Sequence, residues 1–250
     1  MQNAELSIHV LPPSVLPRLA STNQDTKMTP SKGIARRFLA SDVANEVRLK
    51  VVSGAIPPGS RVNEKMLCEE FGISRTPLRE ALKILNSEGL IDLPPNRGAH
   101  VPMLQASQVA EQIEAIGGIE RHAAELAAGK ITSSELIVLR KLQEKIESAF
   151  QSKNAMKYAV SNDQIHKEIV RISGNSILVD VHERLFIQVQ RARALGMSSP
   201  TRWAESVAEH AGILKALEDR DAALTGDLLR KHNANSGVAI VDCILELEKH

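Results

Sequence analysis

Two short stretches of this chain each begin at a residue that caps helices and end at a glycine. Asn63 and Ser74 stand at the two starts, and Gly72 and Gly89 follow the two ends. Asparagine and serine side chains accept hydrogen bonds from the free amides of a first helical turn, and glycine adopts the left-handed conformation that closes many helices. The sequence therefore predicts two short helices joined by a tight turn near Gly72.

The flanking stretches complete a small unit around these two helices. We predict helices, the first capped by Asp42, over residues 42–53, 64–71 and 75–88. Leu90–Leu93 and Ala99–Val101 have strand character, and Pro94–Gly98 between them has the composition of a turn. Three short helices followed by a hairpin form a helix-turn-helix with a wing.

The remainder of the chain has helical periodicity. We expect six helices, over residues 104–129, 132–152, 154–173, 175–197, 202–219 and 221–248. Connections this short place successive helices antiparallel, and the alanine-rich stretch Ala123–Ala128 suits close helix contact. The expected fold is mainly α: a flexible tail over 1–31, a winged helix-turn-helix over 32–103 and an antiparallel bundle over 104–250.

Composition excludes several classes of protein. Hydrophobic residues are 43% of the 250, enough for a core, while aromatic residues are only 2%. That scarcity argues against β-sandwiches and barrels, and against proteins that stack single-stranded bases on aromatic rings. No apolar run reaches the roughly 20 residues that span a bilayer, so no membrane association is expected. The opening Met1–Glu5 does not resemble a secretory signal, so we expect a cytoplasmic protein.

Charge is distributed unevenly along the chain. The formal net charge is +1, but residues 1–102 hold thirteen Lys and Arg against ten Asp and Glu. A mildly basic front half joined to an acidic back half fits a polyanion-binding module fused to a second domain.

The predicted helix 75–88 carries a candidate surface for reading DNA. Arg75 and Arg79 lie four residues apart near its start, so they share one face, and Thr76 is next to them. The first residues of such a helix reach base edges in the major groove, where arginine forks match guanine. Lys65, at the start of the preceding helix, is placed to bind a phosphate. The alternative is that both arginines are simply solvent-exposed surface residues with no binding role.

The predicted hairpin offers a second contact. Gly98 permits close backbone approach, and Arg97 and His100 can enter a minor groove or touch phosphate. The alternative is an ordinary turn, because Pro-Asn-Arg-Gly is good turn chemistry in any protein.

Histidines in the helical half suggest a metal site. Asn162 and His166 are four residues apart on one predicted helix, and His210 and His232 lie on the last two. Facing helices of a bundle can bring such residues onto one ion. Imidazole and amide oxygen suit Zn²⁺ best here, with Ni²⁺ or Mn²⁺ as alternatives. Scattered histidines are also common as surface or core residues.

The predicted winged helix-turn-helix resembles a domain of a known family. The stretches Ile56-Pro-Pro-Gly-Ser-Arg-Val-Asn-Glu, Phe71-Gly-Ile-Ser-Arg-Thr-Pro-Leu-Arg-Glu-Ala-Leu, Glu88-Gly-Leu-Ile and Arg97-Gly-Ala are similar to the winged helix of GntR-family bacterial transcription regulators. The resemblance implies that Arg75, Thr76, Arg79 and the wing glycine with its neighbours contact DNA, and that Lys65 binds phosphate.

The second region resembles the FCD ligand-binding domain of the FadR branch of that family. The matching residues are Asn162-Asp163-Gln164-Ile165-His166, then Ser173-Gly174-Asn175, Glu209-His210 and His232. The resemblance implies an all-helical domain whose divalent metal is held by Asn162, His166, His210 and His232. The predicted count of six helices resembles the VanR-like subgroup.

Two departures from the family pattern affect these expectations. The first ligand position holds Asn162, a weaker cation ligand than a carboxylate, with Asp163 beside it, and either side chain could face the ion. Relatives commonly have an arginine that binds an effector carboxylate where this chain has Ile116. Gln188 and Arg191 are the candidate replacements. The alternative is that each of these side chains faces solvent or a dimer partner.

Together these features predict a ligand-responsive transcription regulator, expected to be a repressor. A homodimer would bind a palindromic operator in double-stranded DNA, and a small metabolite, expected to be an organic acid, would bind at the metal site. The alternative is a metal-dependent hydrolase with Glu209 or Asp163 as general base. The chain lacks HExxH, GxSxG, P-loop and GxGxxG motifs, so we expect no enzymatic activity.

Overall fold

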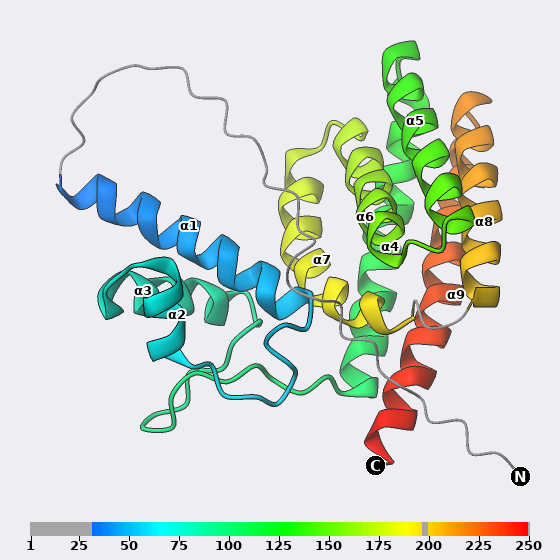
Figure 1. The fold of residues 1–250 in the computed structure, drawn as a ribbon. Helices are drawn as coiled ribbons and strands as arrows, with labels where there is room; N and C mark the ends of the chain where they lie inside the picture. Colours follow the sequence, from blue (N-terminus) through cyan, green and yellow to red (C-terminus); the bar gives the residue numbers. More distant parts are fainter. Residues whose placement is uncertain (1–31, 197–199, 250) are drawn as a thin grey trace, which may run out of the picture. The chain divides into compact units, whose positions relative to one another are not determined.

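The structure, a computed structural model, describes the backbone of residues 32–196 and 200–249 (Figure 1). The predicted tail over 1–31 lies outside the described residues. The chain divides into two compact units, one ending at Met103 and the other beginning at Leu104. Each unit has its own buried core, so each is described by itself.

The first unit contains three helices: α1 (Lys32–Val52), α2 (Glu64–Phe71) and α3 (Arg75–Ser87). Helix α1 begins well before the predicted start, so Asp42 lies inside the helix and the prediction that it is a cap is wrong. The preceding stretch is rich in Ala, Arg and Leu, which favour helix and carry α1 past that point. Val43, Val47 and Val51, at helical spacing, are buried on one face of α1.

The two expected short helices begin and end close to the predicted residues. The Asn63 side chain accepts a hydrogen bond from the Met66 amide at 3.1 Å, and Gly72 closes α2 in the left-handed conformation with φ of 64°. Ser74 stands at the N-cap of α3, but its side chain makes no capping hydrogen bond, so that part of the prediction is wrong.

The predicted hairpin forms as isolated bridges, and the part of the chain that the structure describes contains no regular strand. Asp92 and His100 exchange two backbone hydrogen bonds, of 2.8 and 3.0 Å. A third segment joins them, because Arg61 also bridges His100 and the Val62 amide donates to the Ala99 carbonyl. The wing is therefore tied to the segment that precedes α2, a pairing that the sequence did not indicate.

The second unit is a bundle of six helices within the described residues, as predicted. Its helices are α4 (Ala106–Lys130), α5 (Ser133–Gln151), α6 (Ala155–Ile172), α7 (Ser176–Gly196), α8 (Pro200–Glu218) and α9 (Ala222–Glu248). Side-chain caps begin four of them, at Thr132, Asn154, Asn175 and Asp221. Helix α8 starts at Pro200, which suits the first helical position because no amide donor is needed there.

Close packing of α4 along α9 forms the centre of this bundle (Figure 1). A Cβ on Gly237 of α9 would lie 2.8 Å from Ile113 of α4, so only glycine fits the contact. The predicted small residues Ala124, Ala127 and Ala128 belong to the adjoining core. This close approach brings polar residues of α4 and α9 near those of α6, α7 and α8.

Among the described helices, none is both long enough and apolar enough to cross a membrane.

Candidate functional site

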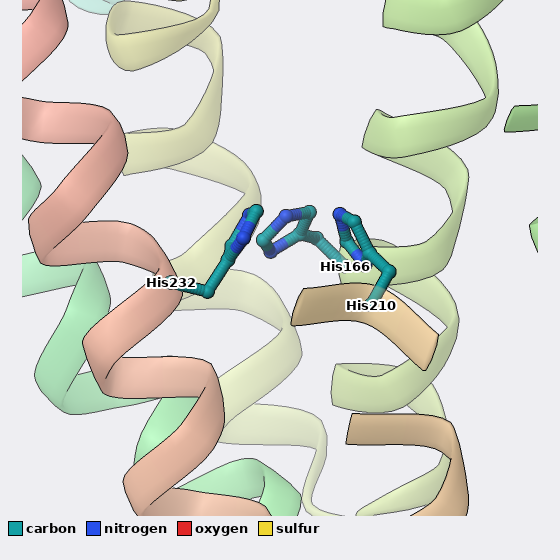
Figure 2. A group of neighbouring side chains, drawn as sticks. All are labelled: His166, His210 and His232. Atoms are coloured by element: carbon teal, nitrogen blue, oxygen red, sulfur yellow. The ribbon is translucent and has the colours of Figure 1, made fainter. Parts of the chain in front are cut away.

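Three histidines from three helices meet in the interior of the bundle (Figure 2). His166 on α6, His210 on α8 and His232 on α9 each offer a ring nitrogen within 4.8 Å of the others. Their ring centroids are separated by 5.4, 5.1 and 4.4 Å. All three side chains are buried. The structure thus brings together the three histidines that the sequence singled out.

Asn162, rather than Asp163, faces this cluster. His210 Nε2 donates to Asn162 Oδ1 at 2.8 Å, because Asn162 lies one turn before His166 on the same face of α6. The neighbouring Asp163 carboxylate instead accepts from Gln190 at 2.6 Å and lies 3.7 Å from Arg193 Nη1.

Glu120 on α4 is a buried residue of the site that sequence reasoning missed. Its carboxylate accepts hydrogen bonds from His166 Nδ1 at 2.6 Å, from His182 Nε2 at 2.8 Å and from Asn233 Nδ2 at 2.7 Å. Because Glu120 accepts the Nδ1 proton of His166, Nε2 of that ring is left as a lone-pair donor. His166 Nε2 is buried and has no hydrogen-bond partner among the residues that the structure describes. A charged residue at helical spacing in an apolar stripe was the signal available in the sequence.

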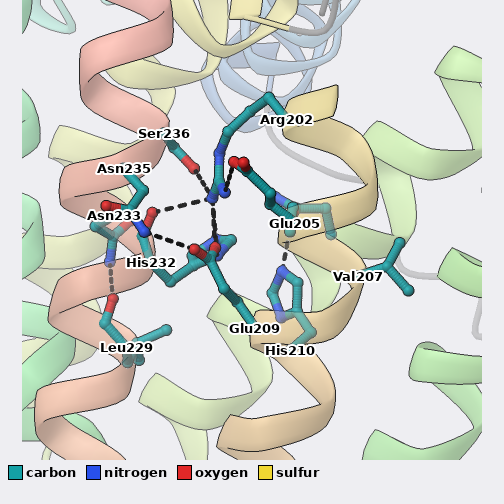
Figure 3. Close-up of polar contacts among 12 residues, drawn as sticks. Arg202, Glu205, Val207, Glu209, His210, Leu229, His232, Asn233, Asn235 and Ser236 are labelled. Atoms are coloured by element: carbon teal, nitrogen blue, oxygen red, sulfur yellow. Dashed lines mark hydrogen bonds and ion pairs between the residues drawn. The ribbon is translucent and has the colours of Figure 1, made fainter. Parts of the chain in front are cut away.

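Glu209 and Arg202, both on α8, form a second polar network beside the cluster (Figure 3). Glu209 accepts from His232 Nδ1 at 2.8 Å, from Arg202 at 2.5 Å and from Asn235 at 2.6 Å. Arg202 also donates to Ser236 at 3.0 Å. Glu209 therefore orients His232 in the same way that Glu120 orients His166.

Burial keeps the clustered imidazoles neutral. Burial lowers the pKa of His166, although Glu120 opposes the shift. Burial, reinforced by the neighbouring histidines, lowers the pKa of His210 well below its usual value, and burial lowers that of His232 to about 4. Burial alone would raise the pKa of Glu120, but His166 and the hydrogen bonds from His166 and His182 hold it well below its usual value.

These donors fit a divalent cation. A metal needs deprotonated nitrogen ligands, and neutral imidazoles supply them at neutral pH. The carboxylates behind His166 and His232 match the pattern in which an acidic residue holds the outer nitrogen of a ligating histidine. A buried Nε2 without a partner is what an ion would satisfy.

The two predicted effector residues, Gln188 and Arg191, both lie on α7. Gln188 accepts a hydrogen bond from Gln112 at 2.9 Å, and Arg191 is buried on α7. Arg193, two residues further along α7, donates to Asn233 at 3.0 Å and lies 3.9 Å from Glu120. Ile116 is fully buried in the apolar core.

A small apolar cavity of about 10 Å³ borders His210. Its other walls include Leu139, Ile165 and Leu217. A cavity of this size holds about one water molecule. A larger molecule therefore requires side chains around the cluster to move before it enters by this route.

Three of the predicted DNA-contacting residues of the first unit line a groove of about 520 Å³. Lys65, Arg75 and Arg79 all contribute to its walls, and Thr76 is exposed beside them. Arg79 Nε lies 3.5 Å from a Glu64 carboxylate oxygen. The structure thus places the three predicted cations around one depression, but it contains no DNA.

The predicted wing residues lie at the turn. Arg97 is exposed, and Gly98 has a φ of 77°, a conformation that side chains other than glycine's rarely allow. His100 is half-buried, and its Nδ1 lies 3.0 Å from the Gly98 carbonyl oxygen. His100 therefore braces the wing from within, while Arg97 points from its tip.

Comparison with known families matches both units. Residues 39–101 match the family described as bacterial regulatory proteins, gntR family, and residues 111–235 match the FCD domain. A winged unit followed by an all-helical FCD unit defines a class of ligand-responsive regulators. The chain belongs to the GntR family, in the FadR-like branch that carries an FCD domain.

Individual relatives agree with this assignment. The chain is 32% identical over 170 residues to the Nta operon transcriptional regulator of Aminobacter aminovorans, covering 68% of this chain and 79% of that one. It is 32% identical over 157 residues to the gluconate operon transcriptional repressor of Bacillus licheniformis, covering 62% and 64%. The solved structure of E. coli McbR/YncC superposes with a TM-score of 0.73 at 26% identity, covering 82% and 97%.

Family membership sets aside the hydrolase alternative, because these proteins are DNA-binding regulators and not enzymes. The carboxylates of the two candidate general bases also already accept hydrogen bonds from neighbouring side chains. Glu209 is held by His232 and Arg202, and Asp163 by Gln190. FCD domains bind small-molecule effectors, and some bind metals.

Proposed function

We propose that this chain is a metabolite-responsive repressor that acts in the cytoplasm and binds a palindromic operator as a homodimer. The observation that carries the proposal is the groove that gathers Lys65, Arg75 and Arg79 at the start of the recognition helix α3. Its relatives include a gluconate operon repressor and a probable D-xylose utilization operon repressor, which supports repression. A dimer would present two such helices to successive major grooves.

In this proposal the candidate DNA-contacting residues of the winged unit have three roles. Arg75, Thr76 and Arg79 contact base edges, because they project from the first turns of α3. Lys65 contacts a phosphate, and the wing residues Arg97, Gly98 and His100 approach the minor groove or the backbone. When DNA binds, Arg79 either leaves Glu64 or contacts Glu64 and a base at the same time. The ion pair does not prevent this, since an exposed pair at 3.5 Å is weak.

We further propose that Asn162, His166, His210 and His232 hold one divalent metal ion, with zinc favoured and nickel or manganese as alternatives. Glu120 and Glu209 support the proposal because they hold the outer nitrogens of two of the histidines. When bound, the ion would act as a Lewis acid and attract an anionic group of the effector. Asn162 is neutral, so the four ligands leave the full charge of the ion for that anion.

The effector is proposed to be an organic acid. Gln188 and Arg191 remain candidates for its recognition, and Arg193 is added because its Nη1 is buried without a hydrogen-bond partner near the cluster. An effector that favours one arrangement of the winged units by about 1–3 kcal/mol changes the affinity for the operator about 5- to 150-fold. Side chains around the small cavity beside His210 would rearrange when the effector enters, and this rearrangement is one way to couple effector binding to the arrangement of the winged units.

The proposal is tested by selecting binding sites from random duplex DNA at about 150 mM salt, where nonspecific charge contacts are weak. The zinc-loaded protein and the chelated protein are selected in parallel. Recovery of one short palindrome supports a dimeric, sequence-specific regulator. Failure of both folded preparations to enrich any sequence contradicts it.

A further inference from the structure

The groove of the winged unit contains a cation that the motif did not single out. Arg61 lines it together with Lys65, Arg75 and Arg79, and among the described residues Glu64 is the one carboxylate on its walls. Four cations against one anion give the depression a strongly positive potential. Arg61 comes from the segment before α2, so the groove is walled by that segment, by α2 and by α3.

Arg61 also lies against the wing. A Cβ built on Gly98 would stand 3.1 Å from both Nε and Nη2 of Arg61, so the guanidinium covers the Cα of Gly98. The Arg61 backbone is bridged to His100, which fixes the register of this contact. The guanidinium is therefore placed between the wing and the start of the recognition helix.

Within the described residues, Arg61 takes part in none of the ion pairs, and its side chain is exposed. Lys65 and Arg79, in contrast, each have a carboxylate within 4 Å. A guanidinium presents a rigid fork of donors that matches phosphate oxygens. A free fork in a positive groove suits a phosphodiester anion.

We propose that Arg61 binds a DNA phosphate and so joins the contacts of the wing to those of the recognition helix. The inference rests on the DNA binding proposed above and adds a contact that carries no sequence information. Neutralising one phosphate releases counterions, which makes the contribution of Arg61 dependent on salt and independent of base sequence. A purely structural Arg61 would instead support the wing through its packing on Gly98.

The experiment compares Arg61→Gln and Arg61→Lys with the unmodified protein. Affinities are measured over a range of salt concentrations for the duplex selected above and for a scrambled duplex. Arg61→Gln is expected to weaken both duplexes by the same factor, about eightfold per winged unit bound at 0.1 M salt, and to lower the salt slope by about 0.9 per winged unit bound. Arg61→Lys keeps the charge and is expected to keep the slope. The melting temperature should not change, since the side chain is exposed.

Two controls separate the outcomes. Arg140→Gln removes an exposed arginine of the helical unit that pairs with Glu218, and it should leave the slope unchanged. Arg75→Ala should weaken the selected duplex. An unchanged slope in Arg61→Gln, or equal losses in Arg61→Gln and Arg61→Lys, overturns the phosphate contact. If Arg75→Ala also binds normally, the whole DNA interface is refuted, not only Arg61.

Discussion

The two sites of this protein are built in opposite ways. The groove of the winged unit takes its cations from one short stretch, residues 61–79, and leaves them exposed. The histidine cluster takes its residues from several helices, and its polar groups are buried and share hydrogen bonds. Exposed charges act almost independently, whereas removing one member of a buried network leaves the others unpaired. Substitutions should therefore affect binding alone in the groove but stability as well in the cluster.

The largest effect is expected from Glu120→Ala. The substitution leaves three buried donors, on His166, His182 and Asn233, without their acceptor. We expect the free energy of unfolding of the helical unit to fall by about 3–5 kcal/mol, measured by urea titration. Glu114→Ala, at an exposed position of the same helix, is the matched control and should change it by less than about 0.5 kcal/mol. Equal effects of the two variants would contradict the central role of Glu120.

Acidification of the metal-free protein should have the next largest effect. Burial lowers the folded-state pKa of His232 to about 4 from an ordinary value of 6.5. The unfolded chain therefore binds more protons between these values, so stability falls as pH decreases from about 6.5 to 4. The loss is about 3 kcal/mol for this one histidine.

Urea titrations at several pH values measure that loss. His122→Ala is the control, because His122 is exposed and its removal should leave the profile unchanged. A stability that stays constant from pH 7 to pH 4 would show that His232 is not buried as a neutral ring.

Removal of one proposed ligand tests the metal centre itself. His210→Ala should reduce bound metal from about one ion per chain to background, measured by elemental analysis. A metal present at a hundredfold excess over its dissociation constant stabilises the folded protein by about 2.7 kcal/mol, and the variant should lose this gain. Its winged unit should still bind nonspecific DNA, since that unit has a separate core. Full metal content in the variant would eliminate His210 as a ligand.

In the groove, Arg79→Ala should cost less and should not destabilise the fold. We expect a loss of about 1–3 kcal/mol in binding to the selected duplex, with relaxed base preference at one position of each half-site. Affinity for a scrambled duplex should change much less. Lys83→Ala, further along α3 and paired with Glu80, is the comparison variant. An Arg79→Ala protein with unaltered base preference would show that this arginine reads no base.

The same contrast explains what could be predicted from the sequence. The groove follows from local signals: Asn63 and Gly72 set the length of α2, and helical spacing places Arg75 and Arg79 on one face. Arg61 was missed because its contact with Gly98 depends on a pairing between distant segments. Asp42 was misassigned as a cap because a capping residue within a strong helix-forming stretch does not start a helix.

The cluster could be predicted only in part. Asn162 and His166 share a face by spacing alone. His210 and His232 were candidates from their places on the last two predicted helices, and the family resemblance joined all four as one ligand set. Glu120 could not be found this way, because its function depends on the close contact of α4 with α9 that Gly237 allows. Likewise, nothing in the local sequence separates Arg191 from Arg193, which only the packing of α7 distinguishes.

The smallest effect is expected from deletion of residues 1–31, which the sequence predicts to be a flexible tail. The cations of the groove all come from residues 61–79, so its affinity should not depend on the tail. We expect binding to the selected duplex at about 150 mM salt to change by less than about twofold, or 0.4 kcal/mol. A binding isotherm for the truncated protein, with the full chain beside it, measures this. A tenfold loss would make the tail a contact arm, and the DNA interface would then not be as local as the groove suggests.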